Sequence, residues 1–97
     1  MTSAIIEIEG EDEIVIYKGK DANRENLLEF LCEFNKDYES NYGSTLFKPC
    51  ALIRHTTTLP KELNDNDWII FPKNNQGLDQ DITYTLKLDG SVTHVNS

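Results

Sequence analysis

Apolar and polar positions alternate at the start of the chain. Residues 5–9 and 13–17 are rich in isoleucine and valine, and residues 10–12, Gly-Glu-Asp, are typical of a short turn. Because side chains alternate along a strand, Ile6 and Ile8 share one face of the first segment. The pattern predicts a β-hairpin.

After the predicted hairpin, apolar residues recur with the period of an α-helix. Asp21 is suited to the N-cap of a helix, and Gly43 is suited to end it in a left-handed conformation. We expect a helix over residues 22–41. Apolar residues recur there at three- and four-residue spacing and form one stripe, which consists of Leu27, Phe30, Leu31, Phe34 and Tyr38.

The segment after the helix is rich in β-branched side chains. Residues 50–58 predict a strand that ends before Pro60. Residues 60–63 predict a single helical turn, because proline is tolerated at the first helical position. Residues 64–67, Asn-Asp-Asn-Asp, are typical of a turn.

Three more strands are expected near the C-terminus. Residues 68–71, Trp-Ile-Ile-Phe, predict a short buried strand with Trp68 in the core, ended by Pro72. Residues 82–88 and 91–95 flank Asp89-Gly90, a strong hairpin signal.

The order of elements is therefore β-β-α-β-β-β-β. Successive strands joined by short turns favour antiparallel pairing, and one amphipathic helix is enough to cover one face of such a sheet. The 97 residues contain no linker or repeat, which fits a single domain over residues 1–97. We predict an α+β fold, a curved antiparallel sheet with one helix packed on one face.

The net charge narrows the range of partners. Nine Lys and Arg against seventeen Asp and Glu give a charge of −8 and a pI near 4.5. Direct binding of nucleic acid or of anionic membranes is disfavoured, because both need clustered cations. We expect a basic protein partner, although acidity also serves solubility alone.

Four acids are spaced by four residues along the predicted helix: Glu25, Glu29, Glu33 and Asp37. Neighbours in this row lie about 6 Å apart, which resembles the charge spacing of a nucleic-acid strand, so the row can imitate a phosphate backbone in a basic groove. A solvated polar face is the alternative, since the row lies opposite the apolar stripe. Like-charge pairs at this spacing cost about 0.2–0.5 kcal/mol each, so helix stability alone does not explain the row, and both interpretations stay open.

A second acidic group surrounds the first turn and includes Glu11, Asp12 and Glu13. Residues 1–48 hold eleven acids and five bases, so this group and the helix row can form one negative surface. A charged hairpin tip that protects a sheet edge is the alternative. Affinity also needs apolar anchors. The candidates are Tyr42 and Phe47, near the end of the predicted helix, and Leu78, in the polar loop 73–81.

No arrangement of residues indicates catalysis. On one strand, Cys50 and His55 point to opposite faces, and nothing fixes a meeting of His55 with His94. Glycine-rich phosphate loops and zinc-ligand spacings are missing from the sequence, so we expect no enzyme activity, cofactor or metal. Two cysteines outside any disulfide-type spacing, and an N-terminus without a signal-peptide pattern, predict reduced thiols in a cytoplasmic protein.

The sequence therefore favours a small acidic binding or inhibitor protein. Such a protein blocks or sequesters a basic partner protein, for which a nucleic-acid-processing protein is one candidate, as in toxin immunity or viral anti-defence inhibition. The alternative is a non-catalytic structural or adaptor subunit whose acidity serves solubility only. The pattern predicts neither the partner's identity nor the oligomeric state.

Overall fold

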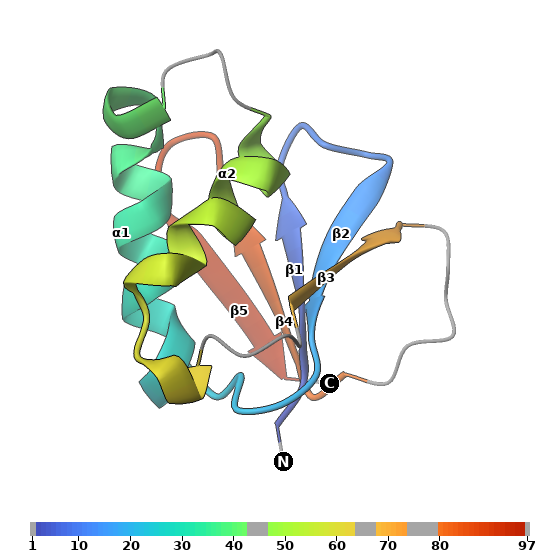
Figure 1. Ribbon diagram of the computed structural model, residues 1–97. Coiled ribbons are helices and arrows are strands. Elements are labelled where there is room, and N and C mark those ends of the chain that lie inside the picture. Colours follow the sequence, from blue (N-terminus) through green and yellow to red (C-terminus); the bar gives the residue numbers. More distant parts are fainter. Residues whose placement is uncertain (1, 43–46, 64–67, 74–79, 97) are drawn as a thin grey trace.

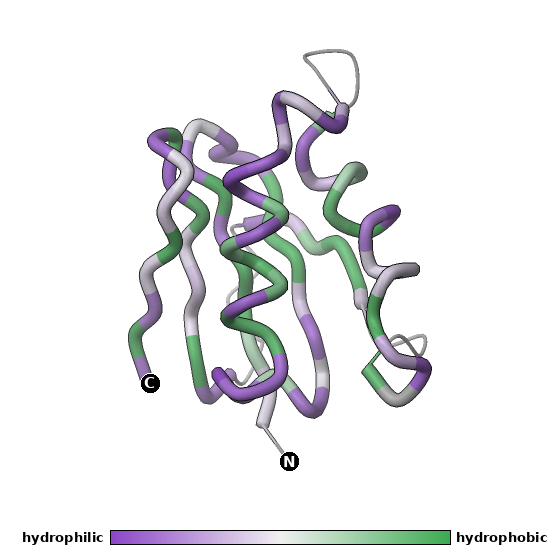
Figure 2. The backbone as a smooth tube through the Cα atoms, turned by 90° about the vertical axis from the view of Figure 1, so that its left-hand side faces the viewer, coloured by the Kyte–Doolittle hydropathy of each residue, from purple (hydrophilic) through white to green (hydrophobic). Residues whose placement is uncertain are grey.

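The computed structural model describes residues 2–42, 47–63, 68–73 and 80–96. In these residues one sheet carries two α-helices on a single face (Figures 1 and 2). The α+β class is confirmed. The elements are β1 (Ala4–Ile8), β2 (Ile14–Lys18), α1 (Arg24–Tyr42), α2 (Lys48–His55), the 3₁₀ turns η1 (Thr56–Thr58) and η2 (Lys61–Leu63), β3 (Trp68–Pro72), β4 (Ile82–Leu86) and β5 (Val92–Asn96).

The sheet is mixed, which corrects the fully antiparallel prediction. Its order is β3-β2-β1-β4-β5, with β1 parallel to β4 and the other three pairs antiparallel. A parallel pair needs a crossover of a dozen residues or more. Here the connection from β1 to β4 runs through β2, both helices and β3, and β4 then pairs with the side of β1 that β2 leaves free.

The segment expected as a strand over residues 50–58 is α2 followed by η1, so the predicted order of elements was wrong here. Pro49 lies in the first turn of α2, where a missing N–H is tolerated. Ala51 and Leu52 are fully buried. The hydroxyls of Thr56, Thr57 and Thr58 each donate to the carbonyl three residues earlier, at 2.6, 3.1 and 2.9 Å. The β-branched run therefore caps a helix, because these hydroxyls satisfy its last carbonyl groups.

Helix α1 begins later than predicted. Its first intrahelical bond runs from the N–H of Leu27 to the carbonyl of Asn23 at 3.1 Å, so Asn23 takes the N-cap position that we expected for Asp21. Asp21 has a φ of 55° and its carbonyl accepts the side-chain amide of Asn26. Gly43, the predicted C-terminal stop, lies outside the described residues.

The core lies between the sheet and the helices. Leu27, Leu31 and Phe34 of α1 are at most 1% exposed, which confirms the apolar stripe, and Tyr38 is half-buried at its margin. From the sheet come side chains that alternate along the strands, all buried: Ala4, Ile6, Ile8, Ile16, Ile82, Tyr84 and Leu86.

Both predicted hairpins are present. At the β4–β5 turn Gly90 has a φ of 94°, a conformation that favours glycine, and its N–H donates to the carbonyl of Lys87 at 3.2 Å. Strand β4 ends at Leu86, two residues earlier than predicted, and β5 is shifted by one residue, so Leu88 belongs to the turn and is 73% exposed.

Strand β3 is not the buried strand that we predicted. It pairs only with β2 and forms one edge of the sheet, with Ile69 and Ile70 44% and 41% exposed. Trp68 is half-buried against the core. Its ring centroid lies 6.1 Å from that of Phe30 and 5.0 Å from the Nζ of Lys18, a lysine without solvent exposure.

Candidate partner-binding surface

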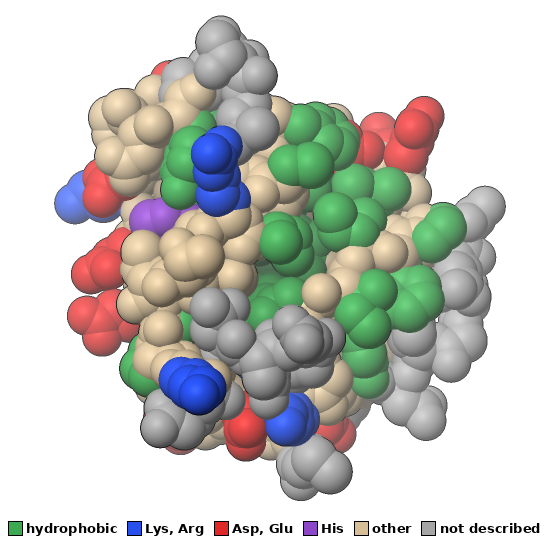
Figure 3. All heavy atoms as spheres, in the orientation of Figure 1, with side chains coloured by type: hydrophobic (Ala, Val, Ile, Leu, Met, Phe, Trp, Pro, Cys, Tyr) green, Lys and Arg blue, Asp and Glu red, His purple; other side chains and the backbone are tan. Residues whose placement is uncertain are grey.

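The acidic row of α1 is accessible along its whole length. Glu25, Glu29, Glu33 and Asp37 are all exposed, and acidic side chains follow the outer margin of α1 on the left of Figure 3. The pKa of Glu25 is lowered by its backbone hydrogen bond and by the amide of Asn23, which donates to Oε2 at 2.7 Å. The last turn of α1 contains no basic residue. The acidic row therefore faces solvent, and the last turn of α1 carries no cation, although cations are favourable at the C-terminal end of a helix.

The acids of the β1–β2 turn are used differently. Oε1 of Glu11 accepts the N–H of Glu13 at 3.0 Å, and the N–H of Glu11 donates to the carbonyl of Ile8 at 2.9 Å. Glu11 thus holds the turn. Asp12 and Glu13 are exposed and remain available to a partner.

The two acidic groups lie at opposite margins of the molecule. In Figure 3 the acids of α1 occupy the left margin and those near the β1–β2 turn the upper right, with α2 and hydrophobic side chains between them. The row on α1 is the larger of the two and the more regular.

The three expected anchors differ in position. Phe47 is 51% exposed. Tyr42 is half-buried, with its hydroxyl 3.0 Å from Nδ1 of His55. Leu78 lies outside the described residues.

A surface pocket of ≈ 340 Å³ lies where the start of α2 meets the β1–β2 and β4–β5 turns. Phe47, Lys48, Leu88 and Tyr38 are among the residues that line it. Nζ of Lys48 lies 5.1 Å from the ring centroid of Tyr38. Burial lowers the pKa of Lys48, and the charges of Glu39 and Glu9 oppose that shift. The pocket offers apolar walls with one cation beside acids.

A neighbouring hollow of ≈ 290 Å³ shares Tyr38, Lys48 and Leu88 with this pocket. Asn35 also lines it. Nδ2 of Asn35 donates to the carbonyls of Lys87 and Ser91 at 2.9 and 2.8 Å, while Oδ1 is buried without a partner among the described residues. The wall of the hollow therefore includes a side chain with an acceptor that needs a donor.

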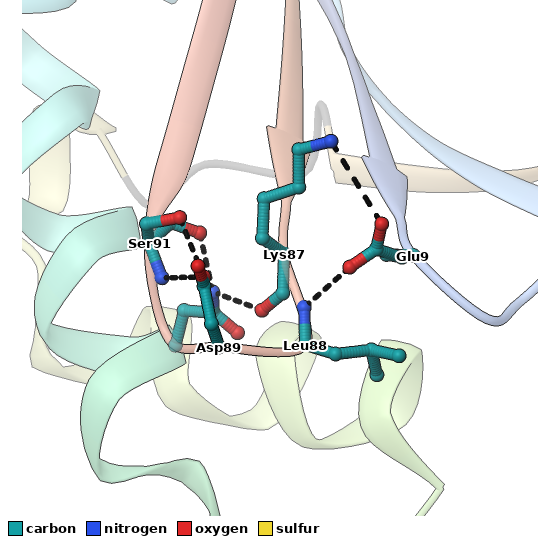
Figure 4. A network of polar contacts seen from close by, with 6 residues as sticks. Glu9, Lys87, Leu88, Asp89 and Ser91 are labelled. Carbon is teal, nitrogen blue, oxygen red and sulfur yellow. Dashed lines mark hydrogen bonds and ion pairs between the residues drawn. The ribbon is translucent and has the colours of Figure 1, made fainter.

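Figure 4 shows what holds the β4–β5 turn against β1. Oε1 of Glu9 accepts the N–H of Leu88 at 2.7 Å, and Oε2 lies 3.8 Å from Nζ of Lys87. Oδ1 of Asp89 accepts the N–H and the hydroxyl of Ser91 at 2.9 and 2.6 Å, which lowers the pKa of Asp89. These bonds fix the backbone from which Leu88 projects.

The sequence did not predict this pocket. Lys48 fell between expected elements, and Leu88 was expected within a strand. Only Phe47 was named as an anchor. The dipeptide Asp89-Gly90 was the one available signal, because it marks a turn that presents its neighbours to solvent.

Helix α2 changes the placement of Cys50 and His55 from strand to helix. Five helical residues rotate a side chain by about 140° net, so the two still do not share a face. Cys50 is exposed, whereas His55 stacks on Phe30 with ring centroids 5.5 Å apart. His94 belongs to another cluster. Its Nε2 lies 3.3 Å from Nη1 of Arg24, and its ring centroid lies 6.3 Å from that of Tyr84. Both thiols are free in the described part of the chain.

Comparison with protein-family models, with curated proteins and with solved structures finds no match to this chain. No helix among the described residues is long and apolar enough to cross a bilayer. No three His, Cys, Asp or Glu side chains of that part of the chain gather where they could hold a metal ion. The geometry of the surface therefore carries the functional argument.

Proposed function

We propose that this protein binds a basic protein partner through the exposed face of α1 and thereby blocks or sequesters it. One observation carries the proposal: Glu25, Glu29, Glu33 and Asp37 form an exposed row that no cation of the last turn offsets. Complementary charge of this kind raises the association rate and selects against other partners.

The pocket beside the end of α1 supports the proposal. Charge alone gives little affinity at an exposed surface, and a few buried anchors supply most of it. Phe47 and Leu88 form apolar walls, and Tyr38 links the pocket to the helix that bears the row. Tyr38 lies on the opposite side of α1 from the row, so a partner along the row reaches this anchoring site by extending around the C-terminal part of the helix.

The test is affinity capture from lysate with three forms of the protein, followed by binding kinetics on the captured partner. The forms are the parent, Glu29→Lys/Glu33→Lys, and the matched control Asp12→Lys/Glu13→Lys. Both double variants change the net charge equally, and all four positions are exposed, so both folds should persist. We expect the α1 variant to slow association about tenfold or more, mainly at low salt, because exposed charges are screened beyond about 10 Å at 0.1 M.

Equal loss in both variants would show that only net charge matters. Loss in the control alone would move the binding surface to the β1–β2 turn. Unchanged kinetics in a folded α1 variant would refute the role of the row.

A second candidate, an adaptor subunit, is favoured by the helix-free face of the sheet. Strand alternation places several apolar side chains there, with Ile69 44% and Val95 67% exposed. Tyr17 and Phe71 meet edge to face on the same side, with ring centroids 5.9 Å apart. An interface on this face would be insensitive to salt, which separates it from the acidic row.

A further inference from the structure

The two edges of the sheet are protected differently. The N–H of Lys73 donates to the carbonyl of Glu13 at 2.7 Å, so alternation along the β2–β3 ladder makes Ile14 and Pro72 a non-bonded pair. The nitrogen of Pro72 therefore faces outward, where it offers no N–H. A proline at this position blunts an edge against pairing with another strand.

Strand β5 has no such device. The N–H of Lys87 donates to the carbonyl of Ser91 at 2.8 Å, which fixes the alternation along the β4–β5 ladder. The N–H and carbonyl groups of Val92, His94 and Asn96 consequently point away from β4. Residues 90–97 contain no Asp, Glu, Lys, Arg or Pro. Within the described residues, β5 is the last strand of the sheet and nothing pairs with these groups.

One flank of α1 runs along this open edge. Arg24, Leu28 and Cys32 are four residues apart and form one row on the helix. Arg24 lies 3.3 Å from His94, and Asn35 near the other end of the row bonds the carbonyl of Ser91. The row therefore follows β5, and Leu28 packs against the core while Cys32 is half-buried. Beyond it on the helix surface come Glu25 and Glu29.

We propose that an extended segment of the partner, with β-branched residues in its centre and basic residues around them, pairs with the outer edge of β5. Its main chain meets the groups of Val92, His94 and Asn96, as in other cases of strand addition. Side chains on its helix-facing side contact Leu28 and Cys32, and its cations approach Glu25 and Glu29. The choice of a basic occupant rests on the proposed function, whereas the open edge does not.

Charge argues against a second copy as the occupant. Pairing β5 with β5 of another molecule about a two-fold axis would place two acidic α1 helices on the same side of the joined sheet. The chain carries a net charge of −8, so this arrangement is repulsive. A basic segment turns the same acids into favourable contacts.

The probe is a capped peptide with a Val-Thr-Val-Thr-Val centre and two lysines at each end. Amide hydrogen exchange of the wild-type protein is measured by NMR with and without it. We expect at least about tenfold slower exchange at Val92, His94 and Asn96, because new ladder bonds protect these amides. Thr93 and Val95, whose N–H groups already face β4, should change little.

Two further comparisons sharpen the test. His94→Pro removes one outward N–H and should weaken peptide binding about fivefold to tenfold, while His94→Ala keeps the N–H and should bind within about twofold of the parent. The same peptide with glutamate for lysine should bind at least about tenfold more weakly.

The outcomes separate the two proposals. Shifts confined to α1, with no protection on β5, would overturn strand addition and leave the acidic surface standing. Protection on β5 with equal affinity for both peptides would support the open edge and overturn the basic occupant. Protection of the same amides that grows with protein concentration alone would assign the edge to a second copy and overturn the proposal.

Discussion

Tyr84→Phe tests how β4 is tied to the start of α1. Tyr84 has no solvent exposure, and its hydroxyl donates to the carbonyl of Ala22 at 2.7 Å. Ala22 is also fully buried, so the variant leaves that carbonyl without its donor. Removing one partner of a buried hydrogen bond costs about 1–3 kcal/mol, and phenylalanine keeps the ring packing. We expect the free energy of unfolding to fall by about 2 kcal/mol at pH 7.

The pH dependence gives an independent check. Burial is the main cause that raises the pKa of Tyr84 from 10.0 to about 12; the charge of Arg24 lowers this pKa and that of Glu25 raises it, both by less. A folded-state pKa above the unfolded value contributes stability that is complete below pH 10 and is lost as the pH rises toward 12. The advantage of the parent over Tyr84→Phe should therefore shrink across this range.

Urea unfolding followed by Trp68 fluorescence measures both effects, with the m-value as a check that the unfolded state is unchanged. Tyr42→Phe is the matched control, because its half-buried hydroxyl can be replaced by water at His55. It should cost less than about 1 kcal/mol. A Tyr84→Phe variant as stable as the parent would refute the role of the hydroxyl, and a constant difference between pH 9 and pH 12 would refute the raised pKa.

Two further predictions concern the core and the thiols. Leu31→Ala should lower the free energy of unfolding by about 2–5 kcal/mol, because Leu31 is fully buried. Leu28→Ala, at the partly buried flank of α1, should lower it by less. Equal losses in urea unfolding would contradict the packing described for α1. Cys32→Ser/Cys50→Ser should unfold cooperatively, with a free energy of unfolding within about 1 kcal/mol of the parent. Thiol titration of the unreduced parent after unfolding should detect both cysteines. A disulfide in that titration would contradict the free thiols.

Local patterns predicted the elements whose positions depend on local geometry. The spacing of Leu27, Leu31 and Phe34 identified the buried face of α1, because helical periodicity alone decides which side chains share a face. Asp89-Gly90 identified the β4–β5 turn, since glycine takes the positive φ there without strain. The exposure of the acidic row follows from the same periodicity.

Helix α2 was not predictable in this way. Ile53 and the threonines at 56–58 favour a strand by propensity, but tertiary contacts reverse that preference. The ring of His55 packs on Phe30 and Phe34 of α1, each at 5.5 Å between centroids. This packing is available only after α1 has formed on the sheet, so no local window of sequence contains it.

The sequence pattern also did not determine which strands pair with one another. The alternation of Ala4, Ile6 and Ile8 gives the same buried face whether the partner strand is parallel or antiparallel. In the structure Ile6 of β1 pairs with Ile16 of β2 on one side and with Tyr84 of β4 on the other, and this register is not visible in the pattern of any one strand. The pocket at Lys48 and Leu88 depends on this arrangement, because three separate connections meet there.

The acidic row is not a requirement of the fold. Three like-charge pairs at four-residue spacing destabilise α1 by about 1 kcal/mol in total. Burial of Leu27, Leu31 and Phe34 contributes about 1.5–3 kcal/mol for each side chain, so packing on the sheet holds the helix whatever its outer face carries. Lysine at Glu29 or Glu33 would be at least as compatible with the helix. The reason for acids at these positions therefore lies in what contacts the outer face of α1, which is either a partner or solvent alone. Comparing the binding kinetics of Glu29→Lys/Glu33→Lys with those of Asp12→Lys/Glu13→Lys distinguishes these two possibilities.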